Sequence, residues 1–177
     1  MVMLFFQTRC SPLRRKMKLN LAYQRTTYWV HLSRQHIPVR IGRCNHRLDR
    51  FMNSSGYKKF AIISATNPAS EPIKKSKNIF LNQLLKYKII RKGLRFHPTL
   101  ACADARNWPN EAGWIIFDNE LSEIMTLGDQ FGQLAIVTGE TGKITTLVWL
   151  QSKSNLRVKP DTVMQKRRSR IRKSLMH

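Results

Sequence analysis

The sequence predicts a single α+β domain, in which about three helices pack on a mixed β-sheet of five to seven strands. Two observations lead to this fold class. Hydrophobic residues make up 42% of the 177 residues, enough to bury one core in a chain of this length. Between residues 20 and 150, β-rich runs and helical periods are interspersed without the strict alternation of a doubly wound sheet.

The first expected elements are two strands, a helix and a third strand. Residues 27–32 and 37–41 are β-rich and close enough to form a hairpin or two adjacent strands. From Arg43, apolar residues recur at helical spacing until Ser55. Residues 60–65 (FAIISA) form a continuous apolar run, which is typical of a strand buried on both faces.

The clearest helix of the sequence follows this strand. Asn67 precedes a proline that ends the strand and favours an extended conformation at Asn67. The helix is predicted to begin after Ser76, its N-cap, and to end at Gly93. Its buried apolar face is expected to consist of Ile79, Phe80, Leu84 and Tyr87.

The second half is expected to add a helix and up to four strands. Residues 94–103 are ambiguous, because His97-Pro98 interrupts a β-rich run. A strand over 114–117 precedes a helix capped by Asn119, and strands over 133–138 and 144–150 are joined by a hairpin turn. The residues expected to face inward from this helix are Leu121, Ile124, Met125 and, as an open alternative, Gly128.

Charge is unevenly distributed along the chain, whose formal net charge is +22. Residues 1–58 carry a net +11 and residues 151–177 a net +8, whereas residues 59–150 carry only +3. Basic ends favour a polyanionic partner, either nucleic acid or an anionic membrane surface, although basic tails also serve solubility alone. The candidate nucleic-acid-binding residues are Lys166, Arg167, Arg168, Arg170, Arg172 and Lys173.

The ends outside residues 20–150 are expected to lack a core. Residues 1–19 are predicted to be a disordered basic lead, unless translation begins at Met17, and residues 151–177 a tail that is either disordered or a short helix. No apolar run approaches the roughly 18 residues that span a bilayer, so no transmembrane segment is expected. Three widely spaced cysteines indicate reduced thiols, and we expect a cytoplasmic protein.

Spacing excludes several signatures of established chemistry. Gly139 and Gly142 are separated by two residues, instead of the four of a phosphate-binding loop, and a β-rich run follows them. Cys44 and His46 have no second pair at zinc spacing. No serine, cysteine or histidine lies in a nucleophile signature. We therefore expect no metal and no cofactor.

Polar side chains at the ends of predicted strands are the candidate site residues: Tyr23, Asn67, Glu111 and Gln133. If these strand ends converge, an amide, a carboxylate and a phenol line one pocket, and Glu111 is the sole candidate general acid or base. The alternative is ordinary turn chemistry for Asn67 and Gln133, with Glu111 capping backbone or paired with Arg106.

Motifs in a fixed order carry a family resemblance over residues 20–150. The motifs are Ala22-Tyr23, Thr27-Tyr28, Ile41-Gly42, FAIISATNPAS, Asn78 at a helix start, Trp108-Pro109-x-Glu111, Phe131-Gly132-Gln133-x-Ala135 and Leu147-Val148. They resemble the bacterial family known as domain of unknown function 3293, although Asn110 is an extra residue in that family's W-P-E-x-S pattern. The resemblance supports Asn67, Glu111 and Gln133, places Asn78 among the ligand-binding candidates, and implies no activity, substrate or cofactor.

Two functions remain open from the sequence. The first is binding of an unknown small ligand at the strand-end cluster. The second is binding of RNA or DNA through the basic N- and C-terminal arms, with the domain as a scaffold. Whether the protein is an enzyme stays undecided, because no nucleophile or metal site accompanies Glu111.

Overall fold

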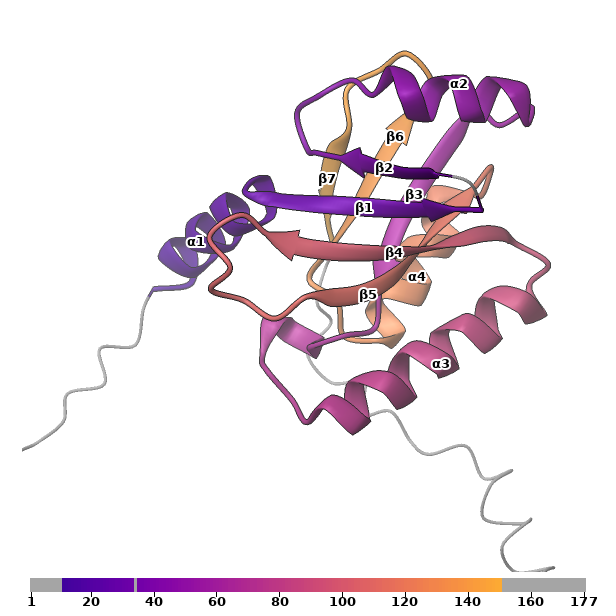
Figure 1. Ribbon diagram of the computed structural model, residues 1–177. Coiled ribbons are helices and arrows are strands. Elements are labelled where there is room, and N and C mark those ends of the chain that lie inside the picture. The colour runs from indigo at the N-terminus through magenta and orange to yellow at the C-terminus, as the bar shows by residue number, and fades with distance from the viewer. Residues whose placement is uncertain (1–10, 34, 151–177) are drawn as a thin grey trace, which may run out of the picture.

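The structure, a computed structural model, describes residues 11–33 and 35–150, which form a seven-stranded sheet with helices on both faces (Figure 1). The elements in chain order are α1 (Pro12–Gln24), β1 (Thr26–Leu32), β2 (Gln35–Val39), α2 (His46–Ser54), β3 (Lys59–Ser64), the short 3-10 helix η1 (Pro68–Ser70), α3 (Lys75–Arg91), β4 (Arg95–Ala103), β5 (Glu111–Phe117), α4 (Leu121–Gln130), β6 (Ala135–Glu140) and β7 (Thr146–Trp149). No helix in these two ranges is long and apolar enough to cross a membrane.

The sheet has the strand order β2-β1-β4-β5-β3-β6-β7, and all of these neighbours are antiparallel. This confirms the α+β class and the predicted number of strands, but the expectation of a mixed sheet is wrong. The connection through α3 passes over β5, and the connection through α4 passes over β3. Parallel strands therefore never become neighbours. The segment from β3 to β6 has the β-α-β-β-α-β order of ferredoxin-like folds, widened by β7 and by the β1–β2 hairpin.

Strand alternation separates two buried clusters on the two faces of the sheet. Ala61 and Ile63 of β3 face α3 and α4, whereas Phe60 and Ile62 face α2. The cluster beside α2 joins side chains from β1 and β2 with Val137 of β6, so the sheet curls around this face. We call the face that carries Phe60 and Ile62 the concave face.

Two backbone hydrogen bonds hold the curl at the α2 end. Gly42 N donates to Thr145 O at 2.8 Å, and Thr145 N donates to Arg43 O at 3.0 Å. They join the loop before α2 to the β6–β7 turn, which lies at the other edge of the sheet. The end of the concave face that carries α2 is therefore closed.

Helix α1 was not expected, because residues 12–19 were assigned to a disordered lead. Ser11 caps it by accepting a hydrogen bond from Arg14 N, and Pro12 occupies the first turn, where its missing N–H is harmless. An apolar period arises where a helix buries one face, and α1 has no buried residue. Its sequence therefore gives no strong helical pattern. The predicted boundary at residue 20 therefore falls inside α1. The expected tail over 151–177 lies outside the described residues.

Helix α3 exists where it was predicted, and Gly93 ends it in the left-handed conformation, but of the four side chains predicted for its buried face only Leu84 packs against the core. Leu85 and Ile89 are fully buried against the sheet. Ile79, Phe80 and Tyr87 point outward and are more than half exposed. The helix is apolar on two sides, and periodicity alone did not indicate which side meets the sheet. Its N-cap is Lys74, so the assignment of Ser76 was also wrong.

Smaller corrections concern α4 and the strand ends. Glu120, and not Asn119, is the N-cap of α4, while the buried Asn119 side chain donates to Ile116 O. Leu121 was expected to face inward but is exposed. Gly128, the open alternative for this face, is buried. Strand β4 runs through Pro98, which lies beyond the end of the β1–β4 ladder and pairs with Trp114 of β5 alone.

Candidate functional site

A cavity of about 690 Å³ lies at the end of the concave face opposite α2. Its floor consists of small residues on neighbouring strands: Ser64, Thr99, Ala101, Gly113 and Ala135. Its walls come from α1, from η1 and from the loop before β5. The hollow exists because these floor residues are too short to meet the elements that surround them.

The four strand-end residues predicted from the sequence come together at this cavity. Tyr23, Asn67, Glu111 and Gln133 all line it, although they are spread over more than a hundred positions of the chain. Asn78, the fifth candidate, lies behind Asn67 in the first turn of α3 and does not line the cavity. The geometry therefore brings together the residues that the resemblance supports.

Glu111 is the acidic centre of the cavity. Strand β5 begins at this residue, and its Oε1 accepts two hydrogen bonds of 2.7 Å, from Asn67 Nδ2 and from Trp108 Nε1. Among the described residues, Oε2 has no partner, and Glu111 forms no ion pair with Arg106. Burial raises the pKa of Glu111, while the hydrogen bonds from Trp108 and Asn67 act in the opposite direction.

Asn67, which donates to Glu111, has a strained backbone conformation. It is left-handed (φ 48°, ψ 63°), and not extended as its position before proline suggested. Its backbone N donates to Asn78 Oδ1 at 2.9 Å, and its own Oδ1 accepts from Asn78 Nδ2 at 2.8 Å. Asn67 is 4% exposed, so these contacts and the bond to Glu111 are made away from solvent. They offset the cost of the left-handed backbone, which asparagine tolerates better than most residues.

The strain continues into η1, and the Phe-Gly-Gln motif supports it. Ala69 and Ser70 also have positive φ values, of 57° and 55°. Ala69 N donates to Gly132 O at 2.7 Å, and a side chain on Gly132 would approach Pro68 to 3.1 Å. Gln133 Nε2 donates to Thr66 O at 3.2 Å. Gln133 thus acts on the loop backbone as well as lining the cavity, as the turn-chemistry alternative expected.

Two tyrosines complete the polar lining. The Tyr23 hydroxyl lies 3.4 Å from Ser70 Oγ, whereas the Tyr28 hydroxyl is buried and has no hydrogen-bond partner among the residues described. Burial raises the pKa of both phenols, and for Tyr28 the nearby Tyr23 and Glu111 add to the effect. Both hydroxyls therefore stay protonated and can donate or accept a hydrogen bond.

Sequence reasoning missed the indole of Trp108 and the contribution of α1. The Trp108-Pro109 pair was noticed, but nothing in the pattern shows that its Nε1 donates to Glu111. Arg15 of α1 donates to Glu71 Oε1 at 2.7 Å and to Ala69 O at 3.0 Å, which ties α1 to η1 across the mouth. Lys18 and Arg25 also line the cavity, so its mouth is basic although its interior is acidic.

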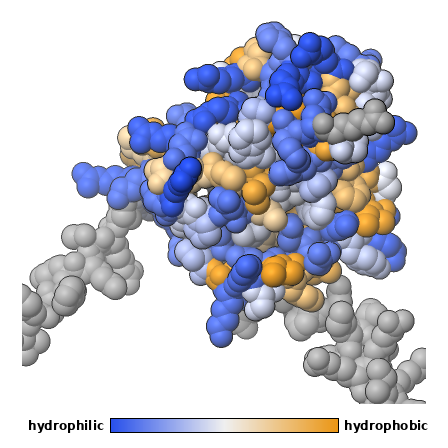
Figure 2. All heavy atoms as spheres, in the orientation of Figure 1, coloured by the Kyte–Doolittle hydropathy of each residue, from blue (hydrophilic) through white to orange (hydrophobic). Residues whose placement is uncertain are grey.

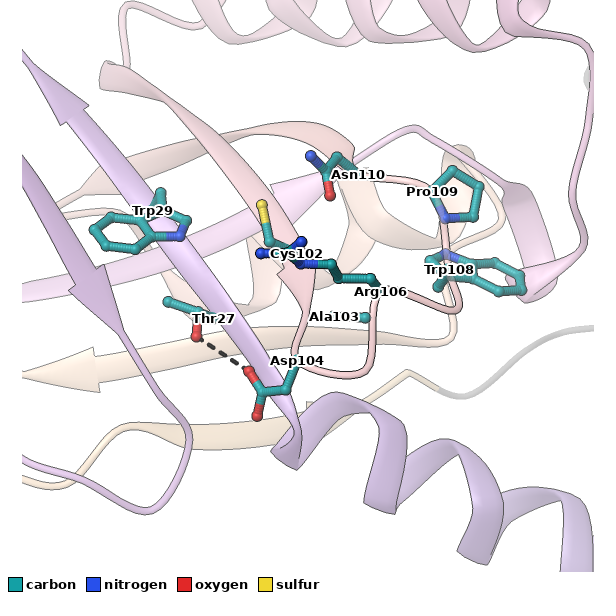
Figure 3. A pocket seen from close by; sticks show the side chains of 9 residues that line it. All are labelled: Thr27, Trp29, Cys102, Ala103, Asp104, Arg106, Trp108, Pro109 and Asn110. Atoms are coloured by element: carbon teal, nitrogen blue, oxygen red, sulfur yellow. Dashed lines mark hydrogen bonds between the residues drawn. The ribbon is translucent and has the colours of Figure 1, made fainter.

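A second, more open hollow of about 620 Å³ lies on the opposite face of β1 and β4 (Figure 3). Trp29, Cys102 and Arg106 line it, and Trp108 lines both hollows. Its acid, Asp104, is already paired: Arg40 donates to both of its oxygens, at 2.6 and 3.0 Å. The pKa of Asp104 is accordingly lowered by Arg40. Among the described residues, no side chain that lines this hollow has a buried polar atom without a partner, whereas the concave cavity has the Tyr28 hydroxyl.

The part of the chain that the structure describes holds no group of three His, Cys, Asp or Glu side chains suited to a metal ion. Within that same part, Cys44 and Cys102 are free thiols. The predicted nucleic-acid-binding residues, from Lys166 to Lys173, lie outside the described residues.

Residues 63–136 match the family described as "Protein of unknown function (DUF3293)", so the resemblance predicted from the sequence is confirmed over this range. The range includes Asn67, Asn78, Glu111 and Gln133, and it leaves out α1 with Tyr23. No curated protein and no solved structure matches the chain.

Proposed function

We propose that the concave cavity binds a small organic ligand that has an apolar body and a hydrogen-bond donor directed at Glu111. One observation carries the proposal: around this hollow, Glu111 Oε2 and the Tyr28 hydroxyl lack partners among the described residues. Buried polar atoms are satisfied in most folded proteins, so the unpaired buried Tyr28 hydroxyl beside a cavity favours a ligand or ordered water there. Glu111 Oε2 is not a buried orphan of this kind, but it is free to accept a hydrogen bond from whatever fills the cavity.

The size and lining of the cavity support this kind of ligand. Sites for small molecules enclose roughly 300–1,000 Å³ and combine apolar walls with a few polar groups that fix orientation. The cavity of about 690 Å³ falls in this range, and its apolar lining includes Ile62, Ala101 and Val137.

The polar groups of the cavity determine which hydrogen-bond donor the ligand must carry. Glu111 Oε1 is already saturated by two donors, so Oε2 is the atom left to receive an amine, an amide N–H or a ring amino group. The basic mouth at Lys18 and Arg25 favours a negative charge on the opposite end of the ligand. No catalytic step is proposed, because the cavity offers no activated nucleophile beside Glu111.

Two compounds that share a phenol ring test whether the donor received by Glu111 is a charged amine. Tyramine carries an amine, and 3-(4-hydroxyphenyl)propionate has a carboxylate instead. We expect ligand-observed NMR with the full chain to detect tyramine, and Glu111→Gln to weaken it about tenfold, because the amide lacks the carboxylate's charge. Ala101→Leu should block the hollow and abolish binding.

Glu120→Gln is the matched control, since Glu120 is 81% exposed and pairs with Lys59 far from the cavity lining. It should bind tyramine as the wild type does. Equal binding by wild type and the Glu111→Gln variant contradicts a donor bound at Glu111. Equal binding of the two compounds contradicts a preference for the charged amine, because both carry the same phenol O–H. If neither compound binds, the proposal fails for this chemical class.

We propose nucleic-acid binding as a second candidate, because the charge of the two ends favours a polyanionic partner. The ends carry most of the net +22, and such binding weakens steeply as salt rises. A full-length variant with glutamine at the six C-terminal bases, Lys166, Arg167, Arg168, Arg170, Arg172 and Lys173, should lose affinity for a 20-nucleotide RNA and show a shallower salt dependence. Unchanged affinity and slope contradict this candidate.

A further inference from the structure

The outer face of α3 carries large apolar side chains that no described part of the chain covers. Ile79, Phe80, Tyr87 and Ile90 are between 54% and 58% exposed. Their spacing places them on the side of the helix opposite Leu85 and Ile89, which anchor it to the sheet. Figure 2 shows hydrophobic side chains at the lower edge of the molecule, where Figure 1 places α3.

The charge of this helix has one sign. Among residues 74–92 there are seven lysines and arginines and no acid. Three of the lysines have partners on neighbouring elements: Lys86 lies over the Trp114 ring, Lys88 donates to Gln130 and Lys92 pairs with Glu123.

The remaining bases flank the apolar face. Lys75 and Lys77 are exposed in the first turn, and the Arg91 guanidinium lies 5.9 Å from the centre of the Tyr87 ring and donates to its hydroxyl at 3.2 Å. The outer face therefore has an apolar centre, cations at both ends, and no carboxylate of its own helix to repel an anion.

We infer that the outer face of α3 docks on an anionic lipid surface. Helices that lie in the membrane interface place apolar and aromatic side chains in the headgroup region while flanking Lys and Arg reach anionic headgroups. The 17 residues of α3 extend roughly 25 Å, so all four apolar side chains meet a flat surface together. Tyrosine suits this depth, because its ring is apolar and its hydroxyl polar. The apolar centre favours lipid over nucleic acid, which offers little apolar surface to a helix face.

Vesicle flotation with the full chain tests this inference. The vesicles contain phosphatidylcholine alone, or phosphatidylcholine with 30% phosphatidylglycerol, each at 50 and 300 mM NaCl. We expect binding to the anionic vesicles and part of it to persist at 300 mM NaCl, because apolar insertion is not screened by salt. The double variant Ile79→Ser/Phe80→Ser should bind about tenfold more weakly, and chiefly in the salt-resistant part.

Ile144→Ser is the matched control, since Ile144 is 55% exposed on the β6–β7 turn, away from α3. It should bind as the wild type does. All three proteins should unfold at similar temperatures, because exposed positions contribute little to stability. The inference is overturned if no chain binds, if the double variant binds like the wild type, or if neutral vesicles bind equally well. It is also overturned if the double variant instead loses affinity for RNA or for polyglutamate, which would assign the face to a different partner.

Discussion

The two ends of the concave face are built from the same strands and have opposite characters. At the α2 end, Phe60 and Phe117 pair across β3 and β5 within a closed apolar cluster. At the other end, the same two strands oppose Ser64 to Gly113 and leave a cavity. Between the two ends, Ile62 pairs with Ile115. Side-chain size therefore falls stepwise along both strands toward the site.

This taper shows how one sheet supplies both a core and a cavity without a change of topology. The closed end gains stability by excluding water from large side chains. The open end gives up that burial and places polar atoms of Asn67 and Glu111 where the strands end. The neighbouring β4 shows the same decrease, from His97 through Thr99 to Ala101. We expect mutations at the closed end to act on stability and those at the open end to act on ligand binding.

The largest effect is expected from Ile115→Ala, which truncates a fully buried side chain of the apolar cluster that fills the closed end and extends toward the middle of the concave face. The lost burial and the resulting void should lower the free energy of unfolding by about 2–5 kcal/mol. Urea unfolding followed by circular dichroism measures it. Ile144→Ala, at a half-exposed position, should change it by less than about 0.5 kcal/mol. A loss below about 1 kcal/mol at Ile115 would show that this end is not closely packed.

The next effect is expected at the open end, from Asn67→Ala, because this side chain also holds the loop backbone through Asn78 and so acts on stability as well as on the site. The substitution removes the side-chain bonds to Glu111 and Asn78 and leaves alanine in a left-handed conformation, so about 2–3 kcal/mol of stability should be lost. Asn67→Gly removes the same bonds but tolerates φ 48°, and it should recover about 1 kcal/mol of that loss. Equal stability of the two variants would mean that backbone strain at Asn67 contributes nothing.

A smaller effect on stability is expected from the titration of Glu111, because the hydrogen bonds from Trp108 and Asn67 oppose the effect of burial on its pKa. Burial raises the pKa of Glu111 in the folded state, so that state holds the proton more tightly than the unfolded chain. The resulting stability is fully present below the ordinary pKa of 4.5 and is lost as pH rises through the raised value.

Glu111→Gln removes this titration while its amide oxygen still accepts from Trp108 and Asn67. Wild type should therefore lose stability relative to the Glu111→Gln variant between pH 4 and pH 7, as measured by thermal unfolding at each pH. A constant difference across this range, or one of the opposite sign, would contradict the assignment of a raised pKa.

The sequence predicted where most helices and strands lie, but not the order of the strands or the buried face of α3. Strand patterns, turn residues and Gly93 located most elements, because each is a local signal. The antiparallel order was not predictable locally, since it depends on the strand over which each helical connection passes. The predicted face of α3 was wrong for a related reason: Ile79 and Leu85 are equally apolar, and only tertiary packing distinguishes them.

At the site, strand-end position and the family motifs selected Asn67, Glu111 and Gln133 as candidates, and all three line one cavity. The left-handed Asn67 was not predictable, because the bias before proline is overcome by side-chain bonds to residues that are 11 and 44 positions away. Helix α1 was missed because its stability comes from a cap and from Arg15 contacts with η1, neither of which produces an apolar period.

The smallest effect on stability is expected from Tyr28→Phe, and it distinguishes the two ends most sharply. The Tyr28 ring belongs to the closed cluster, while its hydroxyl reaches the cavity and has no hydrogen-bond partner among the described residues. Removing the hydroxyl keeps the packing and relieves an unpaired buried group, so the free energy of unfolding should stay equal or rise by up to about 1 kcal/mol.

Tyr57→Phe, on a ring stacked against Phe117 outside the cavity lining, is the control for loss of a phenol. If the cavity binds a ligand through this hydroxyl, Tyr28→Phe weakens tyramine binding while leaving stability intact, and Tyr57→Phe does neither. A loss of more than about 1 kcal/mol on Tyr28→Phe would mean that the hydroxyl is bonded in solution, and it would remove one of the two unpaired atoms on which the ligand proposal rests.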